Sequence, residues 1–417
     1  MTASPLSPPP NLASLWGQPS FVAFWAARFS SVVAVQIQGV ALAWQIYAIA
    51  RLHKDIQHAA FAVGMIGLAQ FLPLFLLTLT AGEIADRHDR KRIGLICMGV
   101  EVITGLTLAL LAHLHIDALW PIYLVAVVFG ASRAFQSPAL TALGPMLVPR
   151  PLLARSIAWN SLAWQSGSIL GPAIGGLLCA LSPSVAYGVS AGLFGLGMLA
   201  MLRISGITRP QVQPGSRWAL VLEGLAYVWS NKIVFGAISL DLFAVLLGGA
   251  TALLPVFARD VLQVGAQGFG VLRAAPAIGA TVVAVWLGWR PIYRRAGLYM
   301  FAGVATFGAA TAVFAVSQNM ILSVAALAVL GGADMLSVFV RQTLMQVVTP
   351  DVMRGRVSAV SMLFVGASNE LGEFESGVAA RFLGAVQATL FGGIGALIVT
   401  GVWAKLFPAL RRADRLE

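Results

Sequence analysis

Residues 82–92 read GEIADRHDRKR and separate two long apolar stretches of the chain. Gly82 allows two helix ends to approach closely, and Asp86 suits the positive N-terminus of a neighbouring helix. Arg87 and Arg90 follow the aspartate, and arginines bind carboxylates or lipid phosphates. The spacing G-x-x-x-D-R-x-x-R-K/R therefore predicts a tight charged turn between two helices that cross a membrane.

The composition around this turn indicates a membrane protein. Hydrophobic residues make up 59% of the 417 residues, charged residues only 10%, and the mean hydropathy is +0.85. A soluble protein of this length needs far more charge on its surface. Residues 296–316 and 156–202 carry no charge and show no two-residue alternation, so we predict helices rather than the strands of a barrel. The predicted fold class is an all-α membrane protein.

Apolar stretches between turns and charge clusters predict twelve transmembrane helices. We place them at residues 20–49, 60–85, 93–113, 119–147, 153–181, 184–203, 233–259, 265–289, 296–317, 319–348, 354–382 and 384–407. The hydrophilic residues 204–232 predict a cytoplasmic linker between two pseudo-symmetric six-helix bundles, residues 20–203 and 233–407. Outside them we expect a disordered tail at residues 1–19 and a basic tail at residues 408–417.

The basic residues lie mostly between helices and on one side of the predicted membrane. Of the 27 Lys and Arg residues, the outer loops hold few: Arg51, Lys54, Arg259 and Arg381. This asymmetry follows the positive-inside rule, so we expect a multi-pass protein of a bacterial inner membrane with both termini cytoplasmic. A net charge of +11 would suggest nucleic acid in a soluble chain, but basic membrane loops explain it, and we expect no nucleic-acid partner.

The two halves show weak internal similarity. Laying one half on the other without a gap places Arg155 on Arg356 and Arg133 on Asp334. Helix-breaking and loop residues also match, and these set the backbone geometry that a duplicated fold retains. Parallel repeats form a site between two halves that move against each other. We therefore expect function at the seam between the halves.

The turn at residues 82–92 resembles the signature loop of the major facilitator superfamily. The resemblance implies the fold of that superfamily and a conformational latch, in which Asp86 contacts the start of the eleventh span and helps to hold the outward-open state. The predicted latch residues are Gly82, Asp86, Arg87, Arg90 and Arg356.

Residues 167–176 in the fifth span read GSILGPAIGG, which resembles the antiporter motif of the same superfamily. Small residues allow close helix contact, and Pro172 removes a backbone hydrogen bond and so bends the helix. The motif residues are Gly167, Gly171, Pro172, Gly175 and Gly176. Within the superfamily this motif is typical of exporters, and nearly the whole chain resembles the drug:proton antiporter branch, which includes siderophore exporters.

Charged residues inside the predicted spans are candidates for function, because each is costly in lipid unless it is paired or hydrated. Arg133 and Asp334 have opposite signs at matching positions of the two halves. We expect them to face a shared cavity, either as a direct ion pair or paired with other charges, and to form a charge switch with Arg28. The alternative is that each only neutralises another buried group.

Three glutamates of the eleventh span, Glu370, Glu373 and Glu375, replace apolar residues of the first half. Glu370 and Glu373 share a helix face, and close carboxylates away from water cannot all stay ionised. At least one is therefore expected to bind a proton near neutral pH. We expect Glu375 to point elsewhere, toward Arg273 or Arg28. The alternative is a hydrated outer vestibule.

Two further acids lie in predicted spans. Asp241 of the seventh span is the second candidate for proton coupling. Glu101 of the third span is less favoured, because a glutamate there can snorkel to the surface.

These features predict a secondary active transporter that exports a small amphiphilic molecule, a drug or a siderophore, in exchange for protons. A lipid or lysophospholipid transporter of the same fold is the alternative. The sequence shows no nucleophile–base pair, metal-binding motif or P-loop, so we expect no enzyme activity, no cofactor and no metal. The expected partners are the substrate, protons and membrane lipids, and the expected state is a monomer.

Overall fold

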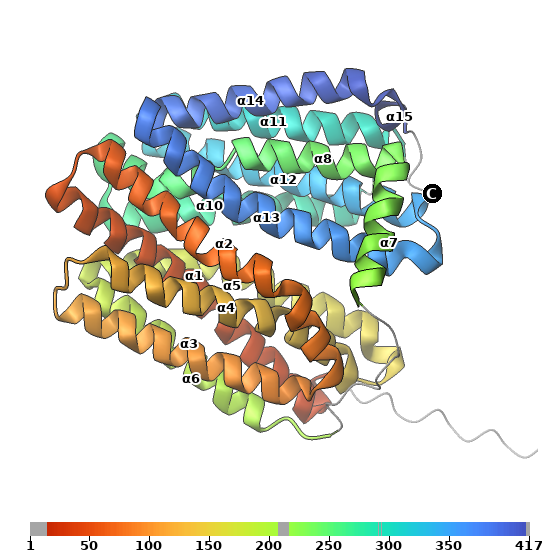
Figure 1. Cartoon of the computed structure of the whole chain (residues 1–417), viewed down its shortest axis with the longest axis horizontal. Helices are drawn as coiled ribbons and strands as arrows, with labels where there is room; N and C mark the ends of the chain where they lie inside the picture. The colour runs from red at the N-terminus through yellow and green to blue at the C-terminus, as the bar shows by residue number, and fades with distance from the viewer. Residues whose placement is uncertain (1–14, 207–216, 291, 293, 414–417) are drawn as a thin grey trace, which may run out of the picture.

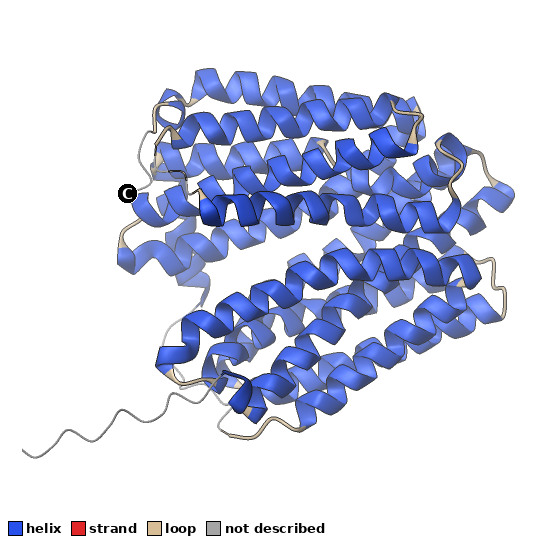
Figure 2. Cartoon of the chain, turned by 180° about the vertical axis from the view of Figure 1, so that it is seen from behind, coloured by secondary structure: helices blue, strands red, loops and turns tan. Residues whose placement is uncertain are grey.

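The computed structural model describes residues 15–206, 217–290, 292 and 294–413. Helices joined by short loops make up nearly all of this part of the chain (Figure 2). Residues 1–14 of the predicted N-terminal tail, 207–216 of the predicted linker and 414–417 of the predicted C-terminal tail lie outside the described residues.

Six long helices form the first bundle. They are α1 Pro19–His53, α2 Ile56–Arg87, α3 Arg90–His113, α4 Leu119–Leu143, α5 Leu153–Leu181 and α6 Pro183–Leu202. In this bundle α1 packs on α5 and α6, α2 on α4, and α3 on α4 and α6. Asp55 caps α2 by accepting a hydrogen bond from the backbone N–H of His58 at 2.8 Å, and this bond holds the pKa of Asp55 below its usual value. Asp89, from the charged turn, caps α3 in the same way at 2.9 Å from the backbone N–H of Lys91.

The second bundle begins with α8 and continues to α14. Its long helices are α8 Lys232–Leu247, α10 Gly265–Trp289, α11 Ala296–Val316, α12 Met320–Val348, α13 Asp351–Leu383 and α14 Ala385–Leu406. Here α10 and α11 pack on α12, α14 packs on α8 and α11, and α13 packs on α8. In the described part of the chain, ten segments are long and apolar enough to cross a membrane, and α5 and α13 are not among them. These two helices carry the antiporter motif and the glutamate cluster.

The seventh predicted span, residues 233–259, is not one continuous helix, which corrects our prediction. Helix α8 ends at Leu247, and the chain continues as η4 Ala250–Leu253, α9 Leu254–Val256 and the π-helix η5 Phe257–Val261. The break falls at two glycines. A Cβ atom at Gly248 would lie 2.4 Å from the Phe307 ring, and one at Gly249 would lie 2.4 Å from the Gly372 carbonyl oxygen. Packing against other helices therefore interrupts this span.

The two bundles approach each other at one end of the molecule and diverge toward the other (Figure 1). We call the first the loop end, because the α1–α2 connection lies there, and the second the terminal end, because α7 Arg217–Ser230 and α15 Pro408–Arg411 lie there. At the loop end α2 packs along α13 and α5 along α10. A Cβ atom at Gly64 of α2 would lie 2.6 Å from the Cα atom of Gly377 of α13, so only glycine allows this approach.

Short ordered elements extend into regions that we predicted as tails. Leu15–Gly17 forms the 3-10 helix η1, in which Leu15 is buried and Trp16 contacts Trp25 and Trp159. Near the other terminus, α15 buries Leu410. These apolar side chains anchor both segments to the bundles, which a reading based on Pro, Ser and Arg content does not reveal.

Candidate functional site

A cavity of about 140 Å³ lies between the two bundles, where α1, α2 and α4 face α10 and α13. Its apolar lining includes Leu42, Ile66 and Phe129. Its polar lining consists of uncharged and charged side chains: Gln36, Gln38, Gln70, Arg133, Arg273, Glu370 and Glu373. The cavity therefore combines apolar walls with two cations and two acids.

An ion pair in this cavity joins the two bundles. Arg133 of α4 places its Nη1 atom 3.5 Å from Oε1 of Glu370 on α13. The same Nη1 donates a hydrogen bond to Oε1 of Gln70 on α2 at 3.1 Å. The Glu370 side chain is only 16% exposed, so separating the pair would leave a poorly hydrated charge on each bundle.

A second ion pair in the cavity lies within the second bundle. Arg273 of α10 places Nη2 3.6 Å from Oε1 of Glu373, and its Nη1 donates to the Thr251 carbonyl oxygen at 3.3 Å. Glu370 and Glu373 thus each have an arginine partner, and the four charges balance. The predicted placement of these glutamates on one helix face agrees with this geometry.

Close contact of α2 and α13 positions the glutamates. A Cβ atom at Gly67 of α2 would lie 2.7 Å from the Glu370 carbonyl oxygen and 2.9 Å from the Glu373 Cβ atom. The absence of a side chain at Gly67 therefore lets the backbone of α13 approach the cavity. Any movement of α2 relative to α13 changes the surroundings of both glutamates.

A second buried cluster lies inside the second bundle. Arg341 of α12 places Nη2 3.2 Å from Oδ2 of Asp241 on α8, and both side chains are almost fully buried. Its Nη1 donates to Ser361 at 3.4 Å. Asp334 of α12 interacts electrostatically with Asp241 and Arg341. Asp241 is thus the carboxyl group paired with Arg341, and the charges of both residues act on Asp334.

Arg133 and Asp334 do not form the direct pair that we considered. Arg133 binds Glu370 in the cavity, whereas Asp334 belongs to the cluster with Asp241 and Arg341. Asp334 is also absent from the lining of the cavity described above. Matching positions in the two halves therefore have different partners. The expectation that both residues face a shared cavity holds for Arg133 but not for Asp334, whose position fits the alternative that it neutralises another buried group.

Arg28 and Glu375 also lie away from the cavity lining. Arg28 of α1 has an Nε atom that is buried without a hydrogen-bond partner. Glu375 lies two residues beyond Glu373, and its carboxyl group interacts with Ser376 by a side-chain hydrogen bond. The arginine that we expected to bind Glu375, Arg273, binds Glu373 instead.

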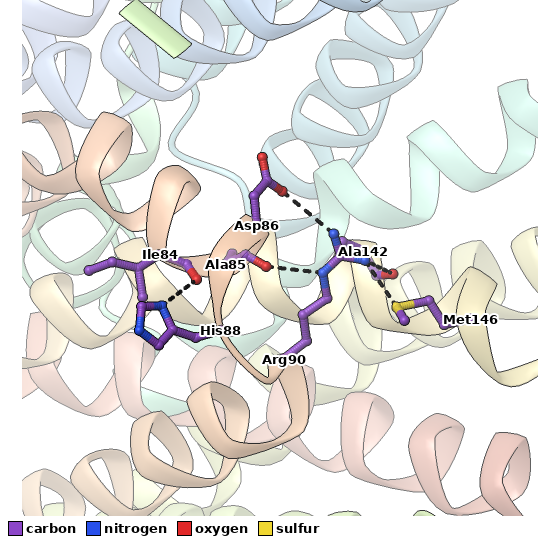
Figure 3. Close-up of polar contacts among 7 residues, drawn as sticks. All are labelled: Ile84, Ala85, Asp86, His88, Arg90, Ala142 and Met146. Carbon is purple, nitrogen blue, oxygen red and sulfur yellow. Dashed lines mark hydrogen bonds and ion pairs between the residues drawn. The ribbon is translucent and has the colours of Figure 1, made fainter. Parts of the chain in front are cut away.

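The charged turn at the terminal end forms a network within the first bundle (Figure 3). Asp86 lies 3.5 Å from Nη2 of Arg90. The same arginine donates to the carbonyl oxygens of Ala85 and Ala142, both at 3.1 Å, and so ties the end of α2 to α4. Arg87 pairs with Glu83 at 2.7 Å along the same helix.

The predicted partner of this turn on the second bundle has a different contact. Arg356, near the start of α13, pairs with Glu223 of α7. The linker helix α7 also packs on α13, where a Cβ atom at Gly224 would lie 2.8 Å from the Arg356 carbonyl oxygen. In this structure Arg356 is therefore bound to the linker helix rather than to Asp86.

The motif glycines of α5 form two separate helix contacts. A Cβ atom at Gly167, Gly171 or Gly175 would press against Val32, Gln36 or Val40 of α1, in that order. These residues recur every four positions on both helices, so α5 and α1 pack closely along one row of positions within the first bundle. Gly176 contacts the second bundle instead, because its Cβ atom would lie 2.6 Å from the Cα atom of Gly270 on α10. Pro172 is buried beside this crossing.

Several polar residues of the interface were missed by the sequence analysis. Gln70 holds Arg133, and Tyr47 donates a hydrogen bond to Asp260 of η5, which also lies 3.2 Å from Nη2 of Arg51. This second contact joins α1 to the second bundle at the loop end. A lone polar residue in an apolar span is the signal that marks Gln70. Glu101 does not snorkel, because it is fully buried.

Within the described residues, no group of three or more His, Cys, Asp or Glu side chains could hold a metal ion. Cys97 and Cys179 are both buried and are not bonded to each other. The chemistry available in the cavity is therefore that of ion pairs, amides and protonatable carboxyl groups.

Two helical bundles with an ion-paired cavity at their seam are the arrangement of a secondary active transporter of the major facilitator superfamily. The sequence profile described as "Transmembrane secretion effector" matches residues 11–417, and the chain belongs to this family. The predicted fold and transporter class are thereby confirmed.

Curated relatives are similar over almost the whole chain. The enterobactin exporter EntS of Shigella dysenteriae serotype 1 (strain Sd197) is 30% identical over 390 residues, which cover 93% of this chain and 88% of the relative. The enterobactin exporter EntS of Escherichia coli O1:K1 / APEC is 30% identical over 392 residues with the same coverage. The predicted resemblance to siderophore exporters is therefore confirmed.

Solved structures share the fold at low sequence identity. The POT family transporter PepTSo has a TM-score of 0.76 at 13% identity and covers 94% of this chain and 98% of its own. The nucleoside transporter NupG has a TM-score of 0.68 at 15% identity and covers 93% of this chain and 99% of its own. These likenesses show that the fold is shared.

Proposed function

We propose that this chain exports a small amphiphilic molecule across a bacterial inner membrane in exchange for protons. A siderophore is the first candidate, because the curated relatives are enterobactin exporters. The observation that carries the coupling proposal is the Arg133–Glu370 ion pair, which joins the two bundles inside the cavity. Transport of this kind requires that binding of the ion shifts the equilibrium between the relative positions of the two halves. The position of the halves must in turn change the affinity for the ion.

The proposed orientation places the terminal end in the cytoplasm. Its support is the positive-inside distribution of Lys and Arg, with Arg87, Arg90 and Arg356 at that end. In this orientation the bundles meet on the periplasmic side and diverge toward the cytoplasm, which corresponds to an inward-facing state. The substrate then enters from the cytoplasm, and the cavity charges lie between it and the closed loop end.

The proposed coupling step is neutralisation of a cavity glutamate. A proton on Glu370 removes the attraction to Arg133, so the contact between α4 and α13 weakens and the bundles are freer to rock. Glu373 with Arg273 forms a second such pair within one bundle. Asp241, which pairs with Arg341 and acts electrostatically on Asp334, remains the reserve proton site.

The substrate class follows from the charges that proton binding releases. When Glu370 is neutral, Arg133 keeps its hydrogen bond to Gln70 but has no carboxylate partner in a cavity with apolar walls. A guanidinium group binds carboxylates and catecholates through paired hydrogen bonds. This chemistry favours an amphiphile with anionic oxygen groups over a lipophilic cation, which would compete with Arg133 for the same glutamates.

The two moving units of this proposal are residues 20–203 and 233–407, joined by residues 204–232. The proposed latch consists of Gly82, Asp86, Arg87, Arg90 and Arg356, and it closes when the terminal end closes. In this structure Arg356 binds Glu223 of α7, so the proposed switch requires Arg356 to exchange this partner. A monomer contains both units and is the proposed functional state.

The proposal is tested by transport in everted membrane vesicles that contain the chain. We expect a candidate siderophore to accumulate when a pH gradient is imposed and to leak out when a protonophore collapses the gradient. Vesicles without the chain are the control. Accumulation that does not respond to the protonophore would contradict proton coupling. Lipid flipping that persists without a gradient, with no siderophore uptake, would favour the lipid transporter instead.

A further inference from the structure

Glu101 is a fully buried glutamate on α3 that the coupling step described above does not use. The residue is 0% exposed. Gln136 of α4 donates a hydrogen bond from Nε2 to Glu101 Oε2 at 2.6 Å, whereas Oε1 is buried without a hydrogen-bond partner. The cation that acts on this carboxyl group is Arg133, which is paired with Glu370 in the cavity. Glu101 thus has one amide donor and no cation of its own.

The other surroundings of Glu101 are neutral. Cys97, one turn earlier on α3, is a buried thiol, and its carbonyl oxygen accepts a hydrogen bond from Ser132 of α4 at 3.1 Å. Helix α6 also packs on α3 and is made of uncharged residues, and its Tyr187 donates its hydroxyl to Gln45. Helices α1 and α2 contact α3 at only a few residues. Within the described chain, Arg133 is the only charged group with an electrostatic effect on the Glu101 carboxyl group.

The energetics favour the neutral form of this carboxyl group. A buried carboxylate needs a paired cation or several donors, and without them the charge is strongly disfavoured. A neutral carboxyl group leaves only one unsatisfied oxygen, which is a smaller penalty. Because Glu101 receives one hydrogen bond and no ion pair, binding a proton is the less costly solution.

Helix α4 connects this carboxyl group to the cavity. Arg133 and Gln136 are three residues apart on α4, so they lie on neighbouring positions of one helix side. Arg133 reaches Glu370 in the cavity, and Gln136 reaches Glu101 on α3. The positive charge of Arg133 therefore acts electrostatically on two carboxyl groups, Glu370 on the second bundle and Glu101 on the first.

We propose that Glu101 is a second proton-binding site, whose occupancy depends on which carboxylate compensates Arg133. While Arg133 is bound to Glu370, Glu101 keeps its proton. When Glu370 takes up a proton and releases Arg133, the uncompensated guanidinium group favours the Glu101 anion, and Glu101 gives up its proton to water. One proton bound on the second bundle is thus matched by one released from the first. This inference rests on the proposed proton-coupled transport.

Infrared difference spectroscopy on the purified full-length chain tests the site directly. A protonated carboxyl group has a C=O stretching band that the carboxylate lacks. We expect the wild type to show such a band at neutral pH and Glu101→Gln to lose it. Glu83→Gln is the matched control, because the Glu83 side chain is 44% exposed and paired with Arg87, so it contributes no protonated band. Unchanged spectra of Glu101→Gln would overturn the proposal.

The link to Arg133 is tested by the pH dependence of the same band. In Arg133→Gln the cation is absent, so the Glu101 band is expected to persist to more alkaline pH than in the wild type. A band with unchanged pH dependence would refute the link. If Glu101→Gln does not fold, Glu101→Asp replaces it in the experiment, because it keeps a carboxyl group. Its C=O band is expected at a different frequency from that of the wild type. A band at the wild-type frequency would overturn the assignment to Glu101. These spectra require neither substrate nor a proton gradient. A negative spectroscopic result would therefore contradict the Glu101 site without contradicting proton-coupled export, which the vesicle experiment tests.

Discussion

The cavity residues balance two arginines against two glutamates, and all four side chains are only 16–31% exposed. Glu370 pairs across the bundles and Glu373 within one bundle. A poorly hydrated charge is tolerated only while its partner is in place. Neutralising one member of a pair therefore affects both the remaining charge and, for Glu370, the contact between the bundles.

Glu373→Gln is expected to abolish proton-driven accumulation while substrate binding remains. The substitution keeps the size of the side chain but removes the group that exchanges a proton and pairs with Arg273. Accumulation in everted vesicles and substrate binding to the purified chain measure the two properties. Glu375→Gln is the matched comparison, because Glu375 lies on the same helix outside the cavity lining and is expected to keep accumulation. Normal accumulation in Glu373→Gln would remove this glutamate from the coupling step.

The sequence was sufficient to find the charged residues of the cavity but not their partners. Intramembrane position alone marks Arg133, Glu370 and Glu373 as candidates, because charge is rare in lipid. Pairing depends on how each helix is rotated about its axis and on contacts far apart in the chain. Asp334 and Glu101 illustrate this limit: the first interacts with Asp241 and Arg341 in its own bundle, and the second is buried against α4.

At the scale of helices, the loop end is held closed by backbone contacts through glycines. Gly64 meets Gly377 between α2 and α13, and Gly176 meets Gly270 between α5 and α10. Close contact of this kind gains van der Waals energy and tolerates no added side chain. These crossings therefore determine how closely the two bundles approach in this state.

Gly64→Leu is expected to disfavour the state in which the loop end is closed. The added side chain would overlap the backbone of Gly377, and overpacking costs about 1–3 kcal/mol, roughly a 5- to 150-fold change in the ratio of states. Distances between spin labels on the ends of α2 and α13 at the loop end measure this ratio. Gly192→Leu on α6 is the control, because a Cβ atom there meets no neighbour within 4 Å. Equal distance distributions in Gly64→Leu and wild type would contradict the packing argument.

Asp89→Ala is expected to destabilise the start of α3. The Asp89 side chain accepts hydrogen bonds from the backbone N–H groups of Lys91 and Arg92, at 2.9 and 3.3 Å, and loss of such a cap costs about 1 kcal/mol. Thermal unfolding in detergent measures the change. Asp89→Asn can still cap the helix and is expected to unfold near the wild-type temperature. Identical unfolding of the alanine and asparagine variants would argue against the cap.

The extent of the helices was largely predictable, because the thickness of the bilayer sets the length of an apolar span. The fifth and eighth predicted spans, residues 153–181 and 265–289, agree with α5 and α10 at both ends. The seventh predicted span, residues 233–259, matches the apolar segment Lys232–Val261, but it was wrongly predicted as one continuous helix. Its interruption at Gly248 and Gly249 depends on Phe307 and Gly372, which lie in other helices. The amino-acid composition of one span does not reveal its contacts with residues in other helices.

At the scale of the whole molecule, the structure represents one state of two bundles that meet at the loop end. At the terminal end Asp86 pairs with Arg90 (Figure 3). Arg356 pairs with Glu223 of α7. In the proposed cycle these contacts change when the terminal end closes. The latch at the terminal end and the Arg133–Glu370 ion pair in the cavity then both affect the equilibrium between the two relative positions of the bundles.

Asp86→Asn is expected to slow transport by favouring the state that is closed at the loop end. The amide cannot supply the negative charge that the proposed latch needs when the terminal end closes. Initial rates of export and the accessibility of single cysteines in the cavity measure the effect. Asp117→Asn, which makes the same change at an exposed position between α3 and α4, is the control. Unaltered rates together with unaltered accessibility would count against the latch.

The central claim is that a proton on Glu370 controls the contact between the two bundles, and proton flux in proteoliposomes tests it most directly. An imposed siderophore gradient is expected to drive protons in the opposite direction in the wild type. In Glu370→Gln the siderophore is expected to move down its gradient without proton movement. Proton movement of wild-type size in Glu370→Gln would contradict the claim.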